Sequence, residues 1–146
     1  MIRYWFYTLL LIAGIVFLCI MSGIHIFAFV DFLSLIIVGI FPFLFVSILF
    51  GFKNMLSALS ICFKKDAEKD KLTMSYNLFK LYGKIIWLTG FIAVIIIVIS
   101  MLTNLDDRSI LGPKIAISLI SLLYSGLLNI VIIIPFTALI KNKLKE

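Results

Sequence analysis

The sequence predicts an all-α integral membrane protein: four transmembrane helices, with a short cytoplasmic helical hairpin between the second and the third. Hydrophobic residues make up 64% of the 146 residues and charged residues only 14%. A soluble domain of this size exposes too much surface for that composition. A helix needs roughly 20 apolar residues to cross a hydrocarbon core about 30 Å thick. Four segments of suitable length lack Asp, Glu, Lys and Arg: Trp5–Phe27, Phe32–Phe52, Ile85–Thr103 and Ile115–Ile140.

Neither an internal repeat nor a long linker divides the chain, so residues 1–146 are predicted to form one membrane domain. The first apolar segment follows Arg3, as the apolar region of a signal peptide follows a basic start. A convincing small-x-small cleavage site is missing, however, and no hydrophilic mature domain follows. We therefore expect Trp5–Phe27 to remain as the first span.

The basic residues predict how the spans are oriented. The sequence holds 13 Lys and Arg residues. All but Arg108 and Lys114 fall on one side when both termini and the 53–84 connection are placed there. Cytoplasmic loops carry the excess of Lys and Arg, so both termini are expected in the cytoplasm. The net charge of +6 then reflects topology and attraction to membrane lipid, and no nucleic-acid partner is expected.

The first two spans are joined by a tight outer turn. Asp31 is expected at the outer interface, because an unpaired carboxylate in hydrocarbon is costly, and there it can cap the second helix. His25 lies about one turn below the same surface, where a structural role is favoured over a proton relay. Pro42 is expected to kink the second span, as prolines commonly do in membrane helices without a functional reason.

The 53–84 connection is expected to form the cytoplasmic hairpin. The second helix should continue past Phe52 into the first arm, and the charged run Lys64–Lys71 should form the solvated turn. The second arm leads into the third span. The hairpin is too small to have a core of its own.

The third span is nearly uniform in Ile and Val, with Thr89 and Ser100 among its few polar residues. The outer loop at 104–109 reads as a turn. Pro113 then suits the first turn of the fourth helix, where its missing N–H costs nothing.

The fourth span carries a polar stripe in an otherwise apolar helix. Its members recur at spacings of three, four and four, which return to one helix face: Ser118, Ser121, Ser125 and Asn129. Such a face contacts either closely packed helices or water. The residues alone leave both interpretations open. Tyr124 can likewise be an ordinary core aromatic, and Pro135 can simply let the helix bend.

Catalytic chemistry is not predicted. The sequence shows no Gly-rich phosphate loop, no nucleophile paired with a base and no metal cluster, so no enzyme activity, cofactor or metal is expected. Cys19 lies inside the first predicted span and Cys62 on the cytoplasmic side, so the two are not expected to pair, and both are interpreted as packing residues. Because none of the four spans contains a charged residue, any ion conduction requires a carboxylate from a partner.

Two stretches carry a resemblance to a known family. Residues 111–128 read Leu-Gly-Pro-x-Ile-Ala-x-Ser-Leu-x-Ser-x-x-Tyr-x-x-Leu-Leu and are followed by Pro135. This resembles the last helix of the MotA/TolQ/ExbB proton-channel family. Residues 31–38 are similar to that family's Asp-x-x-Ser-x-x-x-Val at the outer start of the second span. The predicted topology also fits this family.

The resemblance implies a mechanism and roles for residues. In the family, five four-span subunits surround two copies of a single-span partner that carries a membrane Asp, and ion passage past this Asp drives rotation. Hydroxyls of the third and fourth helices line the path. The ion-path positions implied here are Ser118, Ser121, Ser125, Asn129, Thr89 and Ser100. Structural or positioning roles are implied for Asp31, Ser34, Pro113, Tyr124 and Pro135.

The departures from the family pattern modify this expectation. Ser121 matches the first Thr of the family's Thr-Thr pair, but Leu122 replaces the second. That pair is associated with sodium-driven members, so protons are favoured as the coupling ion. The large cytoplasmic domain of MotA subunits is replaced by about 30 residues here. Flagellar torque is therefore not predicted.

The leading hypothesis is an ion-channel or stator-type subunit of a proton-driven motor complex in the bacterial inner membrane. It would be a homo-oligomer, expected to be a pentamer, around a single-span partner with an intramembrane Asp. The main alternative is a structural or regulatory membrane protein whose polar stripe only packs helices and conducts no ions. A subunit of a transporter or lipid-handling enzyme is the third hypothesis.

Overall fold

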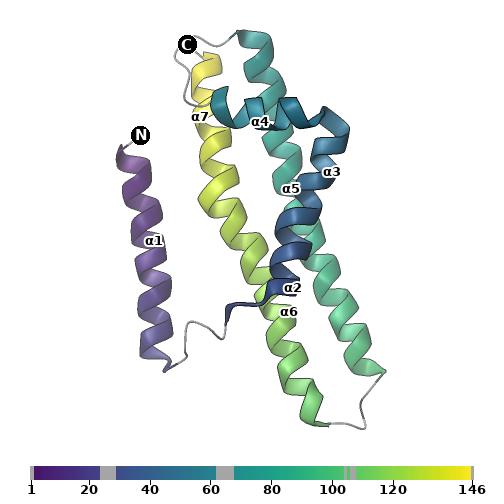
Figure 1. The fold of residues 1–146 in the computed structure, drawn as a ribbon. Helices are drawn as coiled ribbons and strands as arrows, with labels where there is room; N and C mark the ends of the chain where they lie inside the picture. The colour runs from purple at the N-terminus through teal and green to yellow at the C-terminus, as the bar shows by residue number, and fades with distance from the viewer. Residues whose placement is uncertain (1, 24–28, 62–67, 104, 106–107, 146) are drawn as a thin grey trace. The chain divides into compact units, whose positions relative to one another are not determined.

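The computed structural model describes residues 2–23, 29–61, 68–103, 105 and 108–145, and within these residues all regular structure is helical. Figure 1 shows the arrangement of the helices. In chain order they are α1 (Ile2–Met21), α2 (Phe32–Leu35), the π-helix η2 (Ile36–Ile40), α3 (Phe41–Phe50), α4 (Phe52–Ile61), α5 (Lys69–Leu102), α6 (Arg108–Leu128), the π-helix η3 (Asn129–Ile133) and α7 (Ile134–Lys145).

Among the described residues, three helical segments are long and apolar enough to cross a membrane: Phe32–Phe50, Lys69–Leu102 and Ser109–Lys145. They contain most of three predicted spans, so the membrane class of the protein is confirmed. The remaining predicted span overlaps α1, in which Leu9–Met21 forms a shorter apolar helical stretch. Part of that predicted span, including His25, lies outside the described residues.

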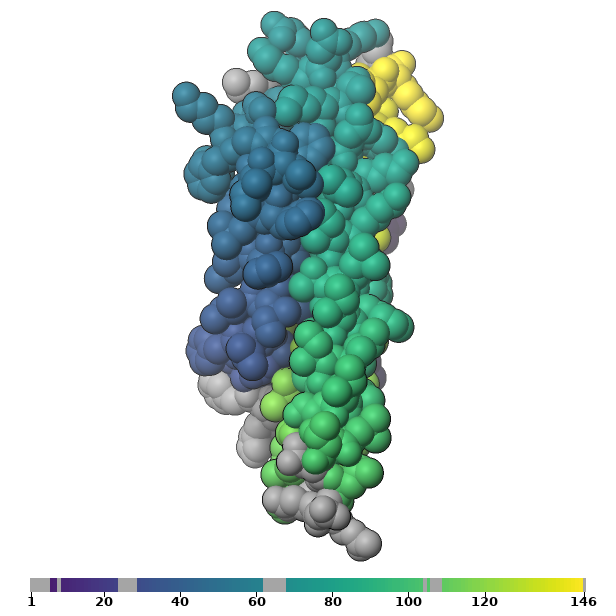
Figure 2. Space-filling view, turned by 90° about the vertical axis from the view of Figure 1, so that its right-hand side faces the viewer, coloured from purple at the N-terminus to yellow at the C-terminus, as the bar shows by residue number. Residues whose placement is uncertain are grey.

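The chain divides into two compact units, Met1–Phe32 and Leu33–Glu146. The first contains α1, whose described side chains are mostly exposed apart from Cys19, which is buried. The second contains the other helices. There α5 packs mainly against α6 and α7 on one side and against η2, α3 and α4 on another. Figure 2 shows α3 and α5 lying side by side along this unit.

The core of the second unit lies between these helices. Fully buried apolar side chains from α3, α4, α5 and α7 meet there, among them Val46, Met55, Phe79 and Ile140. The rings of Phe79 and Phe136 stack with their centroids 5.4 Å apart. The outward faces remain strongly apolar: Ile48 is 83% exposed and Leu88 62%. Such faces suit hydrocarbon as the surrounding solvent.

The expected continuation of the second helix past Phe52 is wrong. Helix α3 ends at Phe50, and Gly51 has φ 87° and ψ 136°. This backbone conformation is accessible essentially to glycine alone. A separate helix, α4, then runs across α5 (Figure 1) and buries Met55, Ala58 and Ile61.

The second arm of the expected hairpin is continuous with the third span, as expected, because α5 runs without a break from Lys69 to Leu102. Residues 62–67, with Cys62 and the first half of the charged turn, lie outside the described residues, as do parts of the outer loop at 104 and 106–107.

Two prolines follow π-helical turns. Helix η2 ends two residues before Pro42, and η3 ends two residues before Pro135. Proline removes one backbone hydrogen bond, and its ring clashes with the carbonyl four residues earlier. The wider π turn accommodates that carbonyl, so each helix continues. Pro113 is the exception: α6 begins at Arg108, and Pro113 is inside the helix and not in its first turn as predicted.

Candidate functional site

The polar stripe of Ser118, Ser121, Ser125 and Asn129 lies on the inner face of α6 and η3. Their exposed fractions are 5%, 1%, 0% and 5%, respectively. The predicted helical spacing therefore does bring the four side chains to one face, and that face packs against other helices of the same chain. In this single chain the stripe is not open to water.

The stripe satisfies much of its hydrogen bonding within its own helix. Ser118 Oγ donates to the Ile115 carbonyl at 2.7 Å, and Ser125 Oγ donates to the Leu122 carbonyl at 2.8 Å. Asn129 Nδ2 donates to the Ser125 carbonyl at 3.0 Å. Bonds of this kind let Ser and Asn reside in an apolar helix, because a buried polar group without a partner is costly.

One member of the stripe bonds to a distant part of the chain. The hydroxyl oxygens of Ser34 and Ser121 are 2.7 Å apart, across 87 residues of sequence. Ser34 lies on α2 and is 2% exposed. The contact joins residues 31–38 to residues 111–128. These are the two stretches that carry the family resemblance.

Two glycines of α5 face the stripe at very close range. A Cβ added at Gly90 would lie 2.5 Å from Ser125 Oγ and 2.7 Å from its Cβ. A Cβ added at Gly83 would lie 2.8 Å from Asn129 Oδ1. Small residues of this kind allow two helix backbones to approach closely in a membrane. These glycines were not predicted as site residues, although their spacing of seven places them on one helix face.

The two ion-path positions predicted on α5, Thr89 and Ser100, form hydrogen bonds with residues outside the stripe. Thr89 is half-buried, and its Oγ1 donates to the Ile85 carbonyl at 2.8 Å. Ser100 accepts from Lys114 Nζ at both its hydroxyl oxygen, at 2.8 Å, and its carbonyl oxygen, at 3.1 Å. The Lys114 contact ties α5 to the start of α6.

The positioning residues surround the stripe or flank it. Tyr124 is partly buried and packs against the apolar core, and Pro135 is buried in α7. Asp31 is partly buried and directly precedes α2. Among the described residues, no group of three His, Cys, Asp or Glu side chains could hold a metal ion.

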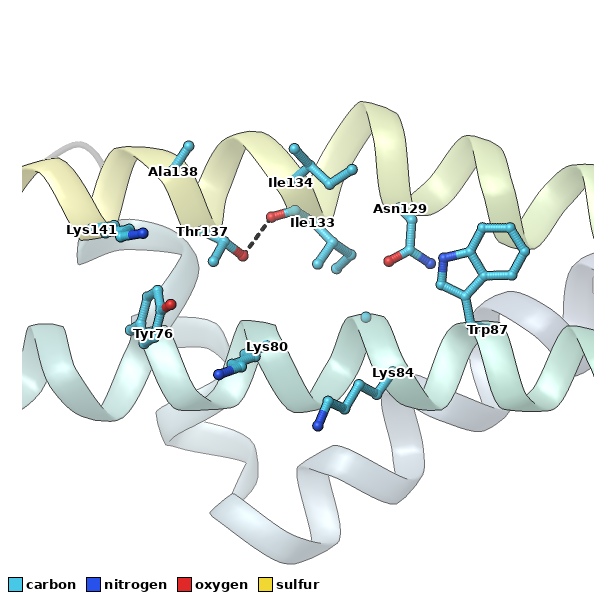
Figure 3. A pocket seen from close by; sticks show the side chains of 11 residues that line it. Tyr76, Lys80, Lys84, Trp87, Asn129, Ile133, Ile134, Thr137, Ala138 and Lys141 are labelled. Atoms are coloured by element: carbon cyan, nitrogen blue, oxygen red, sulfur yellow. Dashed lines mark hydrogen bonds between the residues drawn. The ribbon is translucent and has the colours of Figure 1, made fainter.

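The stripe ends at a surface groove between α5 and the η3–α7 segment. Asn129 lies at one end of this groove, which has a volume of about 440 Å³. Figure 3 shows the groove, with Lys80 and Lys84 on α5 and Lys141 on α7. Buried hydroxyls and a basic groove thus occupy adjoining parts of the same helix pair.

Comparison with known proteins gives one partial similarity and no family assignment. No family model matches the chain. The chain is 28% identical over 74 residues to the chemotaxis protein PomA of Vibrio alginolyticus. The match covers 49% of this chain and 29% of PomA. The chain therefore spans less than a third of the length of PomA.

Proposed function

We propose that this protein is a stator-type ion-channel subunit of a membrane motor complex. The observation that carries the proposal is the Ser34–Ser121 hydrogen bond. It joins the two sequence stretches that resemble the MotA/TolQ/ExbB family, so the resemblance extends to residues in contact. The similarity to PomA gives modest support to the same family.

A partner with a membrane carboxylate is part of the proposal. The stripe offers three hydroxyls and one amide, none of which is ionisable near neutral pH. Proton or sodium carriers normally place an ionisable group inside the membrane. We therefore propose that several copies of this chain, expected to be five, surround a single-span protein that supplies an Asp. Protons are favoured over sodium, since Leu122 stands where sodium-driven members have a second Thr.

The proposed setting is the bacterial inner membrane, with four spans and both termini in the cytoplasm. Helix α1 would be the first of the four spans: its 20 residues reach about 30 Å at 1.5 Å per residue, close to the thickness of the hydrocarbon core. Lys53 of α4 and the lysines at the start of α5 and the end of α7 support this orientation.

The first test is native mass spectrometry of the chain in mild detergent, co-expressed with the protein encoded beside it. Five copies, or five with two copies of a single-span protein, are the expected result. A monomer or symmetric dimer would overturn the proposal, because neither encloses a central partner.

Proton flux tests the role of the stripe. The assembled complex is placed in vesicles with a trapped pH dye, and Ser121→Ala is compared with Ser57→Ala, an exposed hydroxyl on α4. The Ser121 variant should lose most of its flux at unchanged subunit number, whereas Ser57→Ala should conduct normally. Equal flux from both would exclude the Ser121 hydroxyl from the ion path.

A helix-packing protein without conduction is the second candidate. It is favoured by the burial of the whole stripe within one chain and by the close approach of Gly83 and Gly90. This candidate predicts vesicles with no proton flux in the presence of the neighbouring protein. It also predicts that Ser121→Ala changes only the stability of the chain.

A further inference from the structure

The groove beside Asn129 has a strongly basic rim. Lys80 and Lys84 contribute two ammonium groups from α5, and Lys141 contributes a third from α7 (Figure 3). All three lysines are exposed. None of the described residues that line the groove is acidic. The rim therefore attracts an anion and repels a cation, which argues against its being an exit of the proposed ion path.

The sequence places this rim at the edge of the apolar layer. Lys84 directly precedes the apolar run that begins at Ile85, and Lys141 directly follows the run that ends at Ile140. Both lysines line the same groove, although they come from different helices. Their ammonium groups consequently lie at the depth of lipid headgroups.

The groove becomes apolar on the side that leads into the membrane. From Lys84 the next lining residue along α5 is Trp87, which is 47% exposed. From Lys141 the lining runs back along α7 to Ile134, which is 58% exposed. A ligand that fills the groove therefore needs a negative head and an apolar tail. The Trp87 ring is also a typical side chain of the membrane interface.

We propose that this groove binds an anionic phospholipid, with its phosphate at Lys80, Lys84 and Lys141 and an acyl chain over Trp87 and Ile134. The charge of the rim selects the anionic headgroup, and the apolar floor selects the tail. Each lysine near a membrane surface favours an anionic lipid by about 1 kcal/mol, or about fivefold in association constant. The proposal does not depend on ion conduction or on the motor assembly.

Tryptophan fluorescence provides a direct test. The sequence contains two tryptophans, so Trp5→Phe leaves Trp87 as the single reporter. The Trp5→Phe chain is placed in phosphatidylcholine vesicles in which a fixed minor fraction carries brominated acyl chains, either as phosphatidylglycerol or as phosphatidylcholine. Bromine quenches only tryptophans in contact with it. Brominated phosphatidylglycerol should quench Trp87 much more strongly than the same amount of brominated phosphatidylcholine.

Charge variants identify the binding residues. In the Trp5→Phe background, Lys80→Gln, Lys84→Gln and Lys141→Gln should each lower the relative association constant of phosphatidylglycerol about fivefold. The matched control replaces Lys53, Lys69 and Lys71, which are exposed and do not line the groove, by Gln. This control lowers the net charge as much as replacing Lys80, Lys84 and Lys141 together by Gln would. It should nevertheless keep the preference for phosphatidylglycerol over phosphatidylcholine.

Two results would overturn the proposal. Equal quenching by the two brominated lipids in the unaltered groove would remove headgroup selectivity, and this comparison needs no lysine variant to fold. Absence of quenching by either lipid would mean that protein, from a second copy or another chain, covers Trp87. Arg at all three lysine positions serves as the folding control, because it should preserve the preference for phosphatidylglycerol.

Discussion

Ser121 illustrates how a hydroxyl becomes useful inside an apolar helix bundle. Its oxygen is 2.7 Å from that of Ser34 and 3.2 Å from the Ile117 carbonyl oxygen. One hydroxyl can donate once and accept twice, so both contacts are compatible. The Ser34 contact fixes α2 against α6, and it does so without an ionised group whose burial would be costly.

Gly90 is the residue at which a small change should have the largest effect on packing. Gly90→Ala would place a Cβ 2.5 Å from Ser125 Oγ and 2.7 Å from Ser125 Cβ. Because the backbone fixes the Ser125 Cβ, one helix has to move. We expect the free energy of unfolding to fall by about 1–3 kcal/mol, the usual cost of overpacking. Unfolding in mixed micelles of mild detergent and dodecyl sulphate measures this change.

The control for Gly90 lies on α6. A Cβ added at Gly112 meets nothing within 4 Å, so Gly112→Ala should leave stability unchanged or raise it by up to about 1 kcal/mol through helix propensity. The double variant Gly90→Ala/Ser125→Gly removes the obstructing side chain and should recover part of the loss. A Gly90→Ala protein as stable as the parent would show that α5 and α6 do not approach as closely as described.

The sequence predicted which residues of the last helix share a face, but not what they touch. Spacings of three and four between Ser118 and Asn129 specify a face because the helix period is fixed. The same spacing suits a wet surface and a close helix contact equally well. The glycines that distinguish the two are on α5, and only the packed structure pairs Gly90 with Ser125 and Gly83 with Asn129.

At the scale of elements, Gly51 decides where the second long helix ends. Beyond it Met55, Leu56 and Leu59 recur at helical spacing, so the periodicity favoured one continuous helix. Its φ of 87° and ψ of 136° break the helix and redirect the chain into α4. Asn54 stabilises the new start, because its Nδ2 donates to the Phe50 carbonyl at 2.7 Å.

Gly51→Ala tests this break. An added Cβ has room, since its nearest neighbour is Asn54 Nδ2 at 3.7 Å. The expected cost of about 1–3 kcal/mol in the free energy of unfolding therefore comes from backbone strain and not from a clash. The same micelle unfolding assay measures it, with Gly112→Ala again as the control. Unchanged stability would mean that α3 and α4 can join as one helix without penalty.

The prolines show a second limit of prediction at this scale. Pro42 and Pro135 were expected to bend their helices, and the missing backbone N–H makes some irregularity certain. Whether a helix kinks or widens into a π turn depends on the neighbours against which it packs. Here Val38 of η2 and Ile133 of η3 are buried against α5, and the π turns keep those contacts. The periodicity of the sequence does not predict whether a helix kinks or forms a π turn.

At the scale of the whole molecule, charge and hydropathy predicted the membrane class and most of three long helices. Long apolar runs are nearly sufficient for this, because a membrane span must satisfy its backbone internally. The first helix is different. Helix α1 has 20 residues, about the length needed to cross a membrane, and few of the described side chains in its unit are buried. Its position relative to the membrane is therefore a prediction from length and charge.

Cysteine labelling can decide both the orientation and the number of spans. Cys19 and Cys62 are first replaced by Ala, and single cysteines are then introduced by Ile2→Cys, Ser60→Cys and Ser109→Cys. Ser60 on α4 and Ser109 at the start of α6 are both exposed. The excess of lysines lies on the side of the long helices that also carries α4 and Ser60. Ser60 is therefore expected in the cytoplasm and Ser109 outside. If α1 crosses the membrane, residue 2 lies on the same side as residue 60.

On intact cells, a membrane-impermeant maleimide should therefore label only the cysteine at position 109. The cysteines at 2 and 60 should react after the membrane is opened. Labelling at position 60 on intact cells would invert the orientation and contradict the positive-inside argument. Labelling at positions 2 and 109 but not at 60 would leave three spans, because α1 would then begin and end on the outer side. Positions 60 and 109 report the orientation of the bundle, and position 2 compared with position 60 reports whether α1 crosses, so the experiment separates the two questions.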